Sequence, residues 1–587
     1  MVHREGVRKI IEATVRRTPV NDGSSFDLLI SRLGAGLRAY AKEESKRVRA
    51  TLTHLTKAVA QLKQEAMGDP GCLTKRALLD AKELQLKQYQ AARQERLHQQ
   101  AGLTVEMTGE IASKHLPAKV KARKARTQIT ELNIGGAAVT GPKQVLAAAS
   151  AFFNNIFGRD RRVDFDGWEI DPNRRLDGTV TAALTAAWTE QEVKNAFAAL
   201  AKNKSPGSDG LPKELFEAHW DLLGGSFMAM ARDFETSASL PAEIKEAVTI
   251  LLHKKGDRDQ LNNYRPISLL NFTYKVLARV VAGRMKTVLH HVISPEQYGF
   301  LPGRRLSDAV ALVADIIDAA KNGGEDWYLL LVDFQKAFDS LSRDFLFQVL
   351  RGMGFPPLFV KWVEGLHEGT STKLLVNGWL GEGLEVVSGV TQGCPLAPYL
   401  FLCAVEPLAQ EIERAKLGLS KDEQRLNYLG YADDTTLVLQ GKEQIVSAEK
   451  ILDRFERVSG LATNKSKSVV LPLGANLGAQ DDSGGSFKWA GADDAEKLLG
   501  IWVSPSGSGV KTWEKALCHI TKKLIKWKQK YLTTSARATV VTYYIVPIVA
   551  FQAQIYPPPA DTWDDVTHLI HGFVSGNRVL AAKGFIL

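Results

Sequence analysis

The chain has 587 residues, of which 45% are hydrophobic and 24% are charged. These values are close to the average of soluble globular proteins, so they exclude a collagen-like, mucin-like or wholly disordered chain. At roughly 100–200 residues per domain, the length predicts three or four lobes or domains. The four cysteines lie far apart without a C-x-x-C pair, so neither a disulfide framework nor a zinc knuckle is predicted. We therefore expect an intracellular protein, in the nucleus or the cytoplasm.

Positive charge is concentrated in the first 130 residues. They hold 25 Lys and Arg against 13 Asp and Glu, a net charge of +12, whereas the whole chain carries +10. Charges also occupy the first turns, where a signal peptide would need an apolar run of about 7–15 residues. The densest basic stretch, at 118–126, includes Lys119, Lys121, Arg123 and Lys124. Charge alone allows two interpretations of this stretch, phosphate binding and a solvated linker. We predict that its four named basic residues bind nucleic acid.

Helical patterns dominate the first 200 residues. In the stretch 36–100, apolar residues such as Leu55 and Val59 recur at three- and four-residue spacing between Lys, Glu and Gln, which predicts a helical hairpin or arm. Glycine, proline and basic residues from about 100 to 142 predict a connector. Thr189 followed by Glu192 predicts a capping box at the start of a helix that runs through Leu200.

Further along the chain, acidic residues stand at the ends of apolar runs. The run 328–332 suits a strand buried on both faces, and Asp333 follows it. Two apolar runs between 428 and 439 flank Asp433 and Asp434, which predicts a β-hairpin with two carboxylates at its turn. An Asp pair in a turn is ordinarily solvated. If the two strands are neighbours, however, the three carboxylates would repel one another, and we interpret them as a divalent-ion site for phosphoryl transfer.

The apolar stretch 538–560 has the length of a membrane span of roughly 20 residues. Its prolines and glutamines interrupt it. We therefore expect buried helices rather than a membrane helix.

Eight motifs, in this order, closely resemble those of the reverse transcriptases of non-LTR (LINE-type) retrotransposons. They are KSPGSDGLP (204–212), NYRPISLLN (263–271), QYGFLPGRRLSDAV (297–310), LVDFQKAFDS (331–340), GVTQGCPLAPYLF (389–401), YADD (431–434), SGLATNKSKS (459–468) and LLGIW (498–502). The resemblance covers roughly residues 200–505 and continues more weakly to the end.

The resemblance implies an α+β fold. It implies a right-hand polymerase with fingers, a palm with an antiparallel sheet and a thumb, preceded by a helical, basic N-terminal extension. The implied divisions are a helical basic extension with a connector (1–142), an N-terminal fingers-side extension (143–234), fingers and palm (235–505), and a thumb with an incomplete C-terminal region (506–587).

The resemblance also assigns roles to matching positions. Asp333, Asp433 and Asp434 match the catalytic aspartates that hold two Mg²⁺ ions, with Mn²⁺ as an alternative. Lys467 matches a lysine that protonates the leaving pyrophosphate, although the adjacent Lys465 weakens that match. The matches that imply nucleotide binding are Arg265, Phe334, Phe338, Gln392, Lys254 and Lys255. Those that imply nucleic-acid binding are Gly393, Leu499, Gly500, Lys523 and Lys526.

Three of these matches carry more specific expectations. Phe338 matches an aromatic sugar gate, with core packing as the alternative. Gly389 and Gly393, which flank the motif around Gln392, would let the backbone approach nucleic acid closely. The apolar residues between the lysines of 522–531 are expected to turn inward on a helix, so that the lysines face a primer–template duplex.

We therefore expect an RNA-directed DNA polymerase that extends a DNA primer on an RNA template with deoxynucleoside triphosphates. Thr391 and Cys394 stand where many relatives carry arginine and aspartate, so template contacts at that loop are expected to differ. No endonuclease motif set is visible, so we expect an incomplete reading frame whose DNA nick another protein supplies. One alternative is a catalytically inactive or co-opted nucleic-acid-binding relic. A second is an intron-encoded reverse transcriptase or a telomerase.

Overall fold

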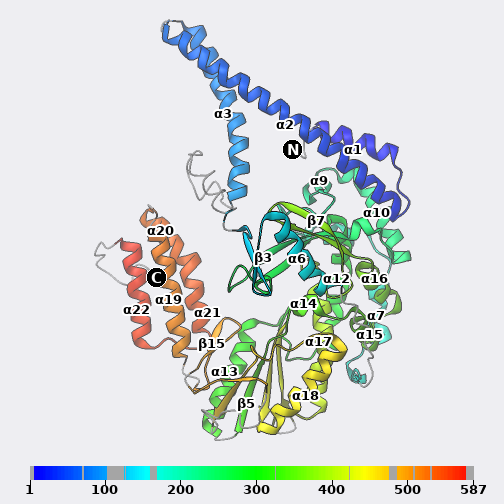
Figure 1. Cartoon of the computed structure of the whole chain (residues 1–587), viewed down its shortest axis with the longest axis vertical. Coiled ribbons are helices and arrows are strands. Elements are labelled where there is room, and N and C mark those ends of the chain that lie inside the picture. Colours follow the sequence, from blue (N-terminus) through cyan, green and yellow to red (C-terminus); the bar gives the residue numbers. More distant parts are fainter. Residues whose placement is uncertain are drawn as a thin grey trace.

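The computed structural model describes residues 5–576, except 69–71, 102–124, 126, 159–167, 324–325, 422–423, 475–485, 493, 507–508, 529 and 531. A body of sheets and helices carries a helical arm that projects from one end, and a smaller helical unit lies beside the body (Figure 1). The body contains two main sheets. Both carry residues that the sequence analysis singles out.

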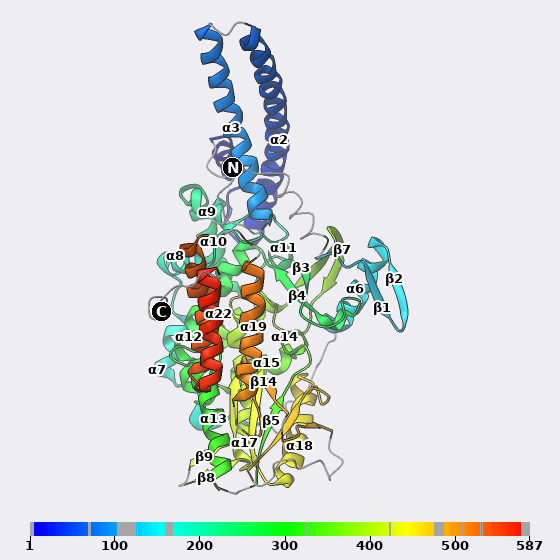
Figure 2. The same ribbon diagram turned by 90° about the vertical axis from the view of Figure 1, so that its left-hand side faces the viewer.

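The arm consists of α1 (Glu5–Arg17), α2 (Gly23–Gly68) and α3 (Leu73–Ala101). The first turns of α2 belong to the main core, because Phe26, Leu29 and Leu33 form one apolar stripe and are fully buried. Farther along, α2 leaves the body and lies beside α3 (Figure 2), with an ion pair of 2.8 Å between Lys63 and Glu83. The predicted helical arm is confirmed.

The first main sheet has the strand order β4-β3-β6-β7. Its strands are β3 (Glu246–His253), β4 (Tyr264–Leu269), β6 (Ser371–Val376) and β7 (Trp379–Glu385). Helix α6 (Pro142–Phe157) packs on this sheet through an apolar cluster that includes Phe153. The predicted connector over 100–142 contains a short hairpin, β1 (Glu131–Ile134) with β2 (Ala137–Thr140), which the sequence analysis did not predict.

The second main sheet has the strand order β10-β11-β5-β12-β13. Its strands are β5 (Asp326–Val332), β10 (Tyr428–Tyr431), β11 (Asp434–Gln440), β12 (Val469–Gly474) and β13 (Lys488–Trp489). β5 is antiparallel to both β11 and β12. Its side chains alternate between two cores, since Leu330 joins the main core and Leu329 joins a second cluster. The predicted strand buried on both faces is therefore confirmed.

Helices cover both faces of the second sheet. Helices α17 (Ala397–Arg414) and α18 (Lys442–Ser459) contribute to the main core on one face, and α13 (Leu306–Gly323) contributes to the second cluster on the other. The remaining helices of the body flank the sheets. They are α7 (Gly178–Thr181), α8 (Glu190–Ala199), α9 (Lys213–Ala218), α10 (Trp220–Ser237), α11 (Ala242–Lys245), α12 (Phe272–Val292), α14 (Ala337–Ser340), α15 (Arg343–Gly352) and α16 (Pro357–His367).

Helix α8 begins as predicted, because the Thr189 hydroxyl accepts a hydrogen bond of 3.1 Å from the backbone N–H of Glu192. The Glu192 carboxylate accepts hydrogen bonds from the Arg284 guanidinium, 2.7 Å away. Within this described segment the structure shows no reciprocal hydrogen bond from the backbone N–H of Thr189 to that carboxylate. Only one of the two hydrogen bonds of a capping box is therefore present here.

The C-terminal unit begins with the hairpin of β14 (Glu496–Leu498) and β15 (Ile501–Val503) and continues as a helical group. Its helices are α19 (Val510–Lys528), α20 (Thr534–Val540), a π-helical turn (Val541–Ile545), α21 (Val546–Ala553) and α22 (Ala560–Ser575). The stretch Thr534–Ala553 is long and apolar enough to cross a membrane, which by itself is weak evidence, and only 22% of it is buried. The expectation of buried helices is therefore wrong for most of this stretch. One stripe, Val540, Val541 and Ile545, packs on α19 and α22, whereas Tyr543 is 72% exposed.

Candidate active site

Three acidic residues lie at one end of the second main sheet. Asp333 follows the last residue of β5, Asp434 begins β11, and Asp433 lies in the turn before it. The register pairs Thr435 with Val332, so Asp434 comes opposite Asp333 one step farther along. Ala432 has a φ of 59°, the left-handed conformation that the first central position of a tight hairpin turn requires. The predicted hairpin is confirmed, and it brings its two carboxylates to Asp333.

The charges of both main sheets act on one another at this point. The pKa of Asp434 is raised to about 6, chiefly by withdrawal from water and then by repulsion from Asp433 and Asp333. Lys254, which follows β3, and Arg265, on β4, oppose that shift. The pKa of Lys254 is lowered by desolvation and by the neighbouring charges of Arg265 and Lys255. Lys254 and Arg265 therefore lie close enough to interact with Asp434, and Lys255 lies close enough to interact with Lys254. The sequence analysis had selected all three cations.

The carboxylates have the donor chemistry of a divalent-ion site. Carboxylate oxygens are the ligands that Mg²⁺ and Mn²⁺ prefer, and a cation would relieve the repulsion that raises the pKa of Asp434. Asp333 and Asp434 both keep part of their surface in contact with solvent, although Asp434 is partly desolvated, so ions from solvent reach them. Within the described residues, no three His, Cys, Asp or Glu side chains are gathered closely enough to form a complete metal cluster.

A buried glutamine holds the turn between β10 and β11, and the sequence analysis missed it. Gln297 is 2% exposed, and its Oε1 accepts 3.0 Å hydrogen bonds from the backbone N–H groups of Gly299 and Ala432. Its Nε2 donates to the hydroxyl of Tyr428, 3.2 Å away. The segment that carries it is fixed in turn by Arg304, which donates to the carbonyls of Ser294 and Gln297. Gln297 thus holds Ala432, the residue before Asp433, and so fixes the turn that carries Asp433.

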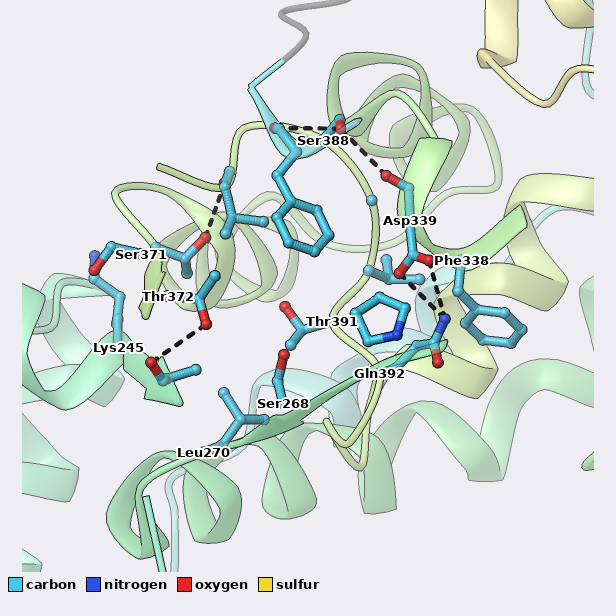
Figure 3. Close-up of a pocket in the computed structure, with 17 residues that line it drawn as sticks. Lys245, Ser268, Leu270, Phe338, Asp339, Ser371, Thr372, Ser388, Thr391 and Gln392 are labelled. Atoms are coloured by element: carbon cyan, nitrogen blue, oxygen red, sulfur yellow. Dashed lines mark hydrogen bonds between the residues drawn. The ribbon is translucent and has the colours of Figure 1, made fainter. Parts of the chain in front are cut away.

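Gln392 and Phe338 lie together beside a small pocket, and Figure 3 shows that they come from different segments. The ring of Phe338 is half-buried and stacks on Phe401, with 4.5 Å between centroids and 17° between planes. The Nε2 of Gln392 donates to both carboxylate oxygens of Asp339, at 3.1 and 3.2 Å. Asp339 is a further polar residue that the sequence analysis did not select.

The glycines that flank Gln392 serve protein packing in this structure. A Cβ on Gly389 would lie 2.6 Å from the carbonyls of Phe338 and Asp339, and a Cβ on Gly393 would lie 2.5 Å from the carbonyl of Ser268. Both residues also have positive φ, 76° and 116°, which side chains rarely adopt. The close approach that we expected toward nucleic acid is therefore made here toward the protein's own backbone.

The two lysines of the segment 464–468 have different surroundings. Lys465 forms 3.0 Å ion pairs with Glu449 and Asp453 on α18, whereas Lys467 is exposed. The same segment supports Asp333, because the Ser468 hydroxyl accepts from the Asp333 N–H at 3.1 Å. Of these two lysines, Lys465 is ion-paired with α18 and Lys467 is exposed to solvent.

Phe334 is directed into the core. Its side chain is 8% exposed and packs near Phe455, with 6.5 Å between ring centroids. This burial favours a packing role over the nucleotide contact that we predicted for it.

The C-terminal residues predicted to bind nucleic acid lie on two elements. Leu499 and Gly500 form the two-residue turn between β14 and β15, both with positive φ. Lys523 and Lys526 lie on α19, where Leu524 faces the core. Ile525 is 55% exposed, so the expectation that all apolar residues of this segment turn inward is wrong for Ile525. Helical geometry puts it 100° from Leu524 and out of the buried stripe.

Four residues predicted to bind nucleic acid lie outside the described part of the chain. They are Lys119, Lys121, Arg123 and Lys124.

Residues 252–502 match a protein-family model described as reverse transcriptase (RNA-dependent DNA polymerase). The chain is 29% identical over 521 residues to the transposon TX1 uncharacterized 149 kDa protein of Xenopus laevis, covering 86% of this chain and 39% of that protein. It is also 29% identical over 290 residues to the Pol polyprotein of the type-2 retrotransposable element R2DM of Drosophila melanogaster, covering 49% of this chain and 26% of that protein.

A third relative is the RNA-directed DNA polymerase from mobile element jockey of Drosophila melanogaster. It is 25% identical over 278 residues, which cover 46% of this chain and 30% of that protein. The chain thus spans less than half the length of each of these relatives. The names of these three proteins refer to a transposon, a retrotransposable element and a mobile element.

Proposed function

We propose that the chain is an RNA-directed DNA polymerase, starting from the fact that residues 252–502 form a reverse transcriptase domain of the type found in non-LTR retrotransposon proteins. It would extend a DNA primer on an RNA template with deoxynucleoside triphosphates. The main support is the position of Asp333, Asp433 and Asp434 at one end of three paired strands, β5, β10 and β11. The cations Lys254 and Arg265 act on this carboxylate site from the neighbouring sheet.

The three aspartates would hold the metal of this site. Reverse transcriptases depend on divalent metal, and we propose two Mg²⁺ ions, which would activate the primer 3′-hydroxyl and neutralise charge on the triphosphate. Gln297 keeps the turn that bears Asp433 in position through the hydrogen bond to Ala432. The Ser468 hydroxyl supports Asp333 in the same way, because it accepts a hydrogen bond from the Asp333 backbone N–H.

Other side chains would bind the nucleotide. Arg265 is exposed on β4, where its planar guanidinium suits phosphate oxygens, and Lys254 adds a second positive charge beside it. Phe338 would lie beneath the sugar, and Gln392 would lie at the nascent base pair. Lys467 would donate the proton that the leaving pyrophosphate takes up.

Three further contacts belong to the same proposal. The turn of Leu499 and Gly500 would grip the primer, and the lysines of α19 would bind the duplex backbone without reading its sequence. The basic stretch 118–126 would bind RNA. Another protein would supply the nick in target DNA.

Primer extension tests this function. The full chain would be incubated with a DNA primer annealed to an RNA template, Mg²⁺ and the four deoxynucleoside triphosphates. We expect products that reach the template end, that disappear with a chelator, and that ribonucleoside triphosphates do not support. A protein that binds the annealed duplex but extends no primer with Mg²⁺ or Mn²⁺ would be a nucleic-acid-binding relic instead.

A further inference from the structure

Phe300 combines an exposed aromatic ring with a strained backbone. The residue is 48% exposed, and its φ is 59°. This left-handed conformation is uncommon for residues other than glycine and an outlier for a bulky one, because it brings Cβ too close to the following carbonyl oxygen. Such strain persists only where the surrounding structure imposes it, and it is concentrated at functional sites. Both features of Phe300 therefore need an explanation in its surroundings.

The residues on both sides of Phe300 are anchored in the body. Gly299 is buried, and its N–H donates to Oε1 of Gln297 at 3.0 Å. Leu301 is 6% exposed and belongs to the main core. Arg304 holds the end of the loop, because its guanidinium donates to the carbonyl of Gln297. These anchors impose the backbone conformation of Phe300, and they leave its ring partly in solvent.

The loop of Phe300 runs beside the turn between β10 and β11. The two segments are parallel, since Gln297 forms a parallel bridge with Gly430. Farther along, a Cβ on Gly299 would clash with the backbone nitrogen of Ala432, so the backbones are in close contact there. The next residue is Phe300 on one segment and the first aspartate of the turn on the other. The exposed ring is therefore carried directly beside one of the carboxylates proposed to hold metal.

Two packing contacts indicate which part of the substrate lies on this side of the turn. Tyr298 packs against the second cluster, and so does Leu499, in the turn proposed to grip the primer. Phe338, proposed to lie beneath the sugar of the incoming nucleotide, packs instead against the main core on the other face of the sheet. This arrangement favours the primer over the incoming nucleotide as the partner of Phe300.

We propose that Phe300 is a primer-binding residue whose ring packs on the sugar of the 3′-terminal primer nucleotide and so holds the 3′-hydroxyl at the aspartates. This inference rests on the proposed polymerase function. The sugar is the fitting partner because stacking inside the duplex covers the faces of the terminal base, whereas the sugar stays open to a side chain. An aromatic ring offers a large apolar surface for such a contact. The contact explains why an exposed ring occupies a strained conformation at this point.

Photo-crosslinking tests this contact without requiring catalysis. The full-length chain would carry Phe300→p-benzoylphenylalanine, which keeps an aromatic ring, and would bind an annealed RNA template and DNA primer that are labelled one strand at a time. We expect a crosslink to the last nucleotide of the primer. The matched control is Trp563→p-benzoylphenylalanine, at an exposed aromatic position on α22, and it should give no crosslink to that nucleotide. Failure of position 300 to crosslink to the last primer nucleotide would overturn the inference.

Phe300→Asn separates primer binding from a packing role. Asparagine adopts the left-handed conformation more easily than phenylalanine does, so the variant should unfold at the parent's temperature or above it. Without the ring, we expect extension at saturating Mg²⁺ and deoxynucleotide to slow by at least tenfold, while template–primer affinity stays within threefold. Phe300→Tyr should behave like the parent. Lys416→Asn makes a similar exchange at another exposed residue with positive φ, 55°, and should leave extension unchanged.

A folded Phe300→Asn whose extension slows less than tenfold would also overturn the inference. If this variant does not fold, the crosslinking result still decides, because that substitution retains an aromatic ring. Absence of all primer extension by the parent would instead reject the proposed function.

Discussion

Phe338 is held in one orientation by its neighbour, because its ring stacks on the buried ring of Phe401. A fixed aromatic ring beneath the sugar would exclude a 2′-hydroxyl, since a close-packed contact has no room for an added atom. We predict that Phe338→Ala raises ribonucleotide use relative to deoxyribonucleotide use while Mg²⁺ dependence persists. Competition assays give the ratio of kcat/KM values for the paired substrates.

Phe338→Tyr is the matched control, because it retains the ring and should keep the parent's selectivity. An unchanged ratio in folded, active Phe338→Ala would show that the ring serves packing and that another residue selects the sugar.

At this scale the sequence allowed the carboxylates to be predicted but not their supports. Asp333, Asp433 and Asp434 stand at the ends of apolar runs, a pattern visible in the chain itself. Asp339 and Gln297 reveal their roles only through partners 53 and 135 residues away.

Among the elements, the segment 297–304 supports the turn of β10 and β11. Gln297→Leu would leave the buried N–H groups of Gly299 and Ala432 without their acceptor, at a cost of about 1–3 kcal/mol each. We predict that this variant is less stable than the parent, extends primers at least tenfold more slowly, and needs more Mg²⁺ for half-maximal extension, because Asp433 is displaced. Thermal unfolding and a Mg²⁺ titration of primer extension measure these effects.

Gln297→Glu is the control for this segment, because its carboxylate still accepts hydrogen bonds. It should retain more activity than Gln297→Leu. A Leu variant with the parent's Mg²⁺ requirement would mean that the turn needs no such support.

The charge of the basic stretch 118–126 has to be tested by substitution rather than by deletion of the N-terminal segment. Removing residues 1–130 would take Val7, Ile11 and Phe26 out of the main core, so lost binding would be ambiguous. We predict that replacing Lys119, Lys121, Arg123 and Lys124 by serine flattens the salt dependence of single-stranded RNA binding, by about 0.7 log units per lost phosphate contact. A salt titration of the dissociation constant measures the slope.

The matched variant carries serine at four lysines of the arm helices, Lys42, Lys57, Lys82 and Lys87. Equal slopes in the parent and the 119–124 variant would assign this stretch to a solvated linker.

For the whole molecule, several buried or crowded carboxyl groups set the dependence of stability on pH. The pKa of Asp209 is raised to about 6 and that of Asp339 to about 7, in both cases chiefly by desolvation. A carboxyl group whose pKa is higher in the folded state binds more protons there than in the unfolded state. Its contribution to the free energy of unfolding therefore falls as pH rises from about 4 to about 6 or 7.

Asp209 tests this relation apart from the catalytic chemistry. Asp209→Asn keeps an oxygen for the N–H of Leu211, which Asp209 binds at 2.8 Å. We predict that the parent loses stability between pH 4 and 6 more steeply than this variant does. Urea unfolding at several pH values gives both slopes, and parallel curves would contradict the raised pKa.

The arrangement of the molecule could be predicted from the sequence only through the resemblance of its motifs. Apolar runs located β5 and the β10–β11 hairpin, but no local pattern indicates that β5 pairs with both β11 and β12. Nor does a local pattern indicate that β3 pairs in parallel with β6. The hairpin of β1 and β2 was missed because its strands are four residues long and carry one fully buried side chain, Leu132. Such short strands lack the alternation from which a strand is predicted.

The central claim is that Asp333, Asp433 and Asp434 together form the metal-dependent site of a polymerase. Primer extension by Asp333→Asn, Asp433→Asn and Asp434→Asn, measured beside template–primer binding, tests it most directly. Each substitution removes one charge with little change of shape, so the variants should bind the duplex as the parent does. We predict that each loses far more than tenfold in extension rate, a barrier increase well above 1.4 kcal/mol. Extension within tenfold of the parent by any of the three would contradict the claim.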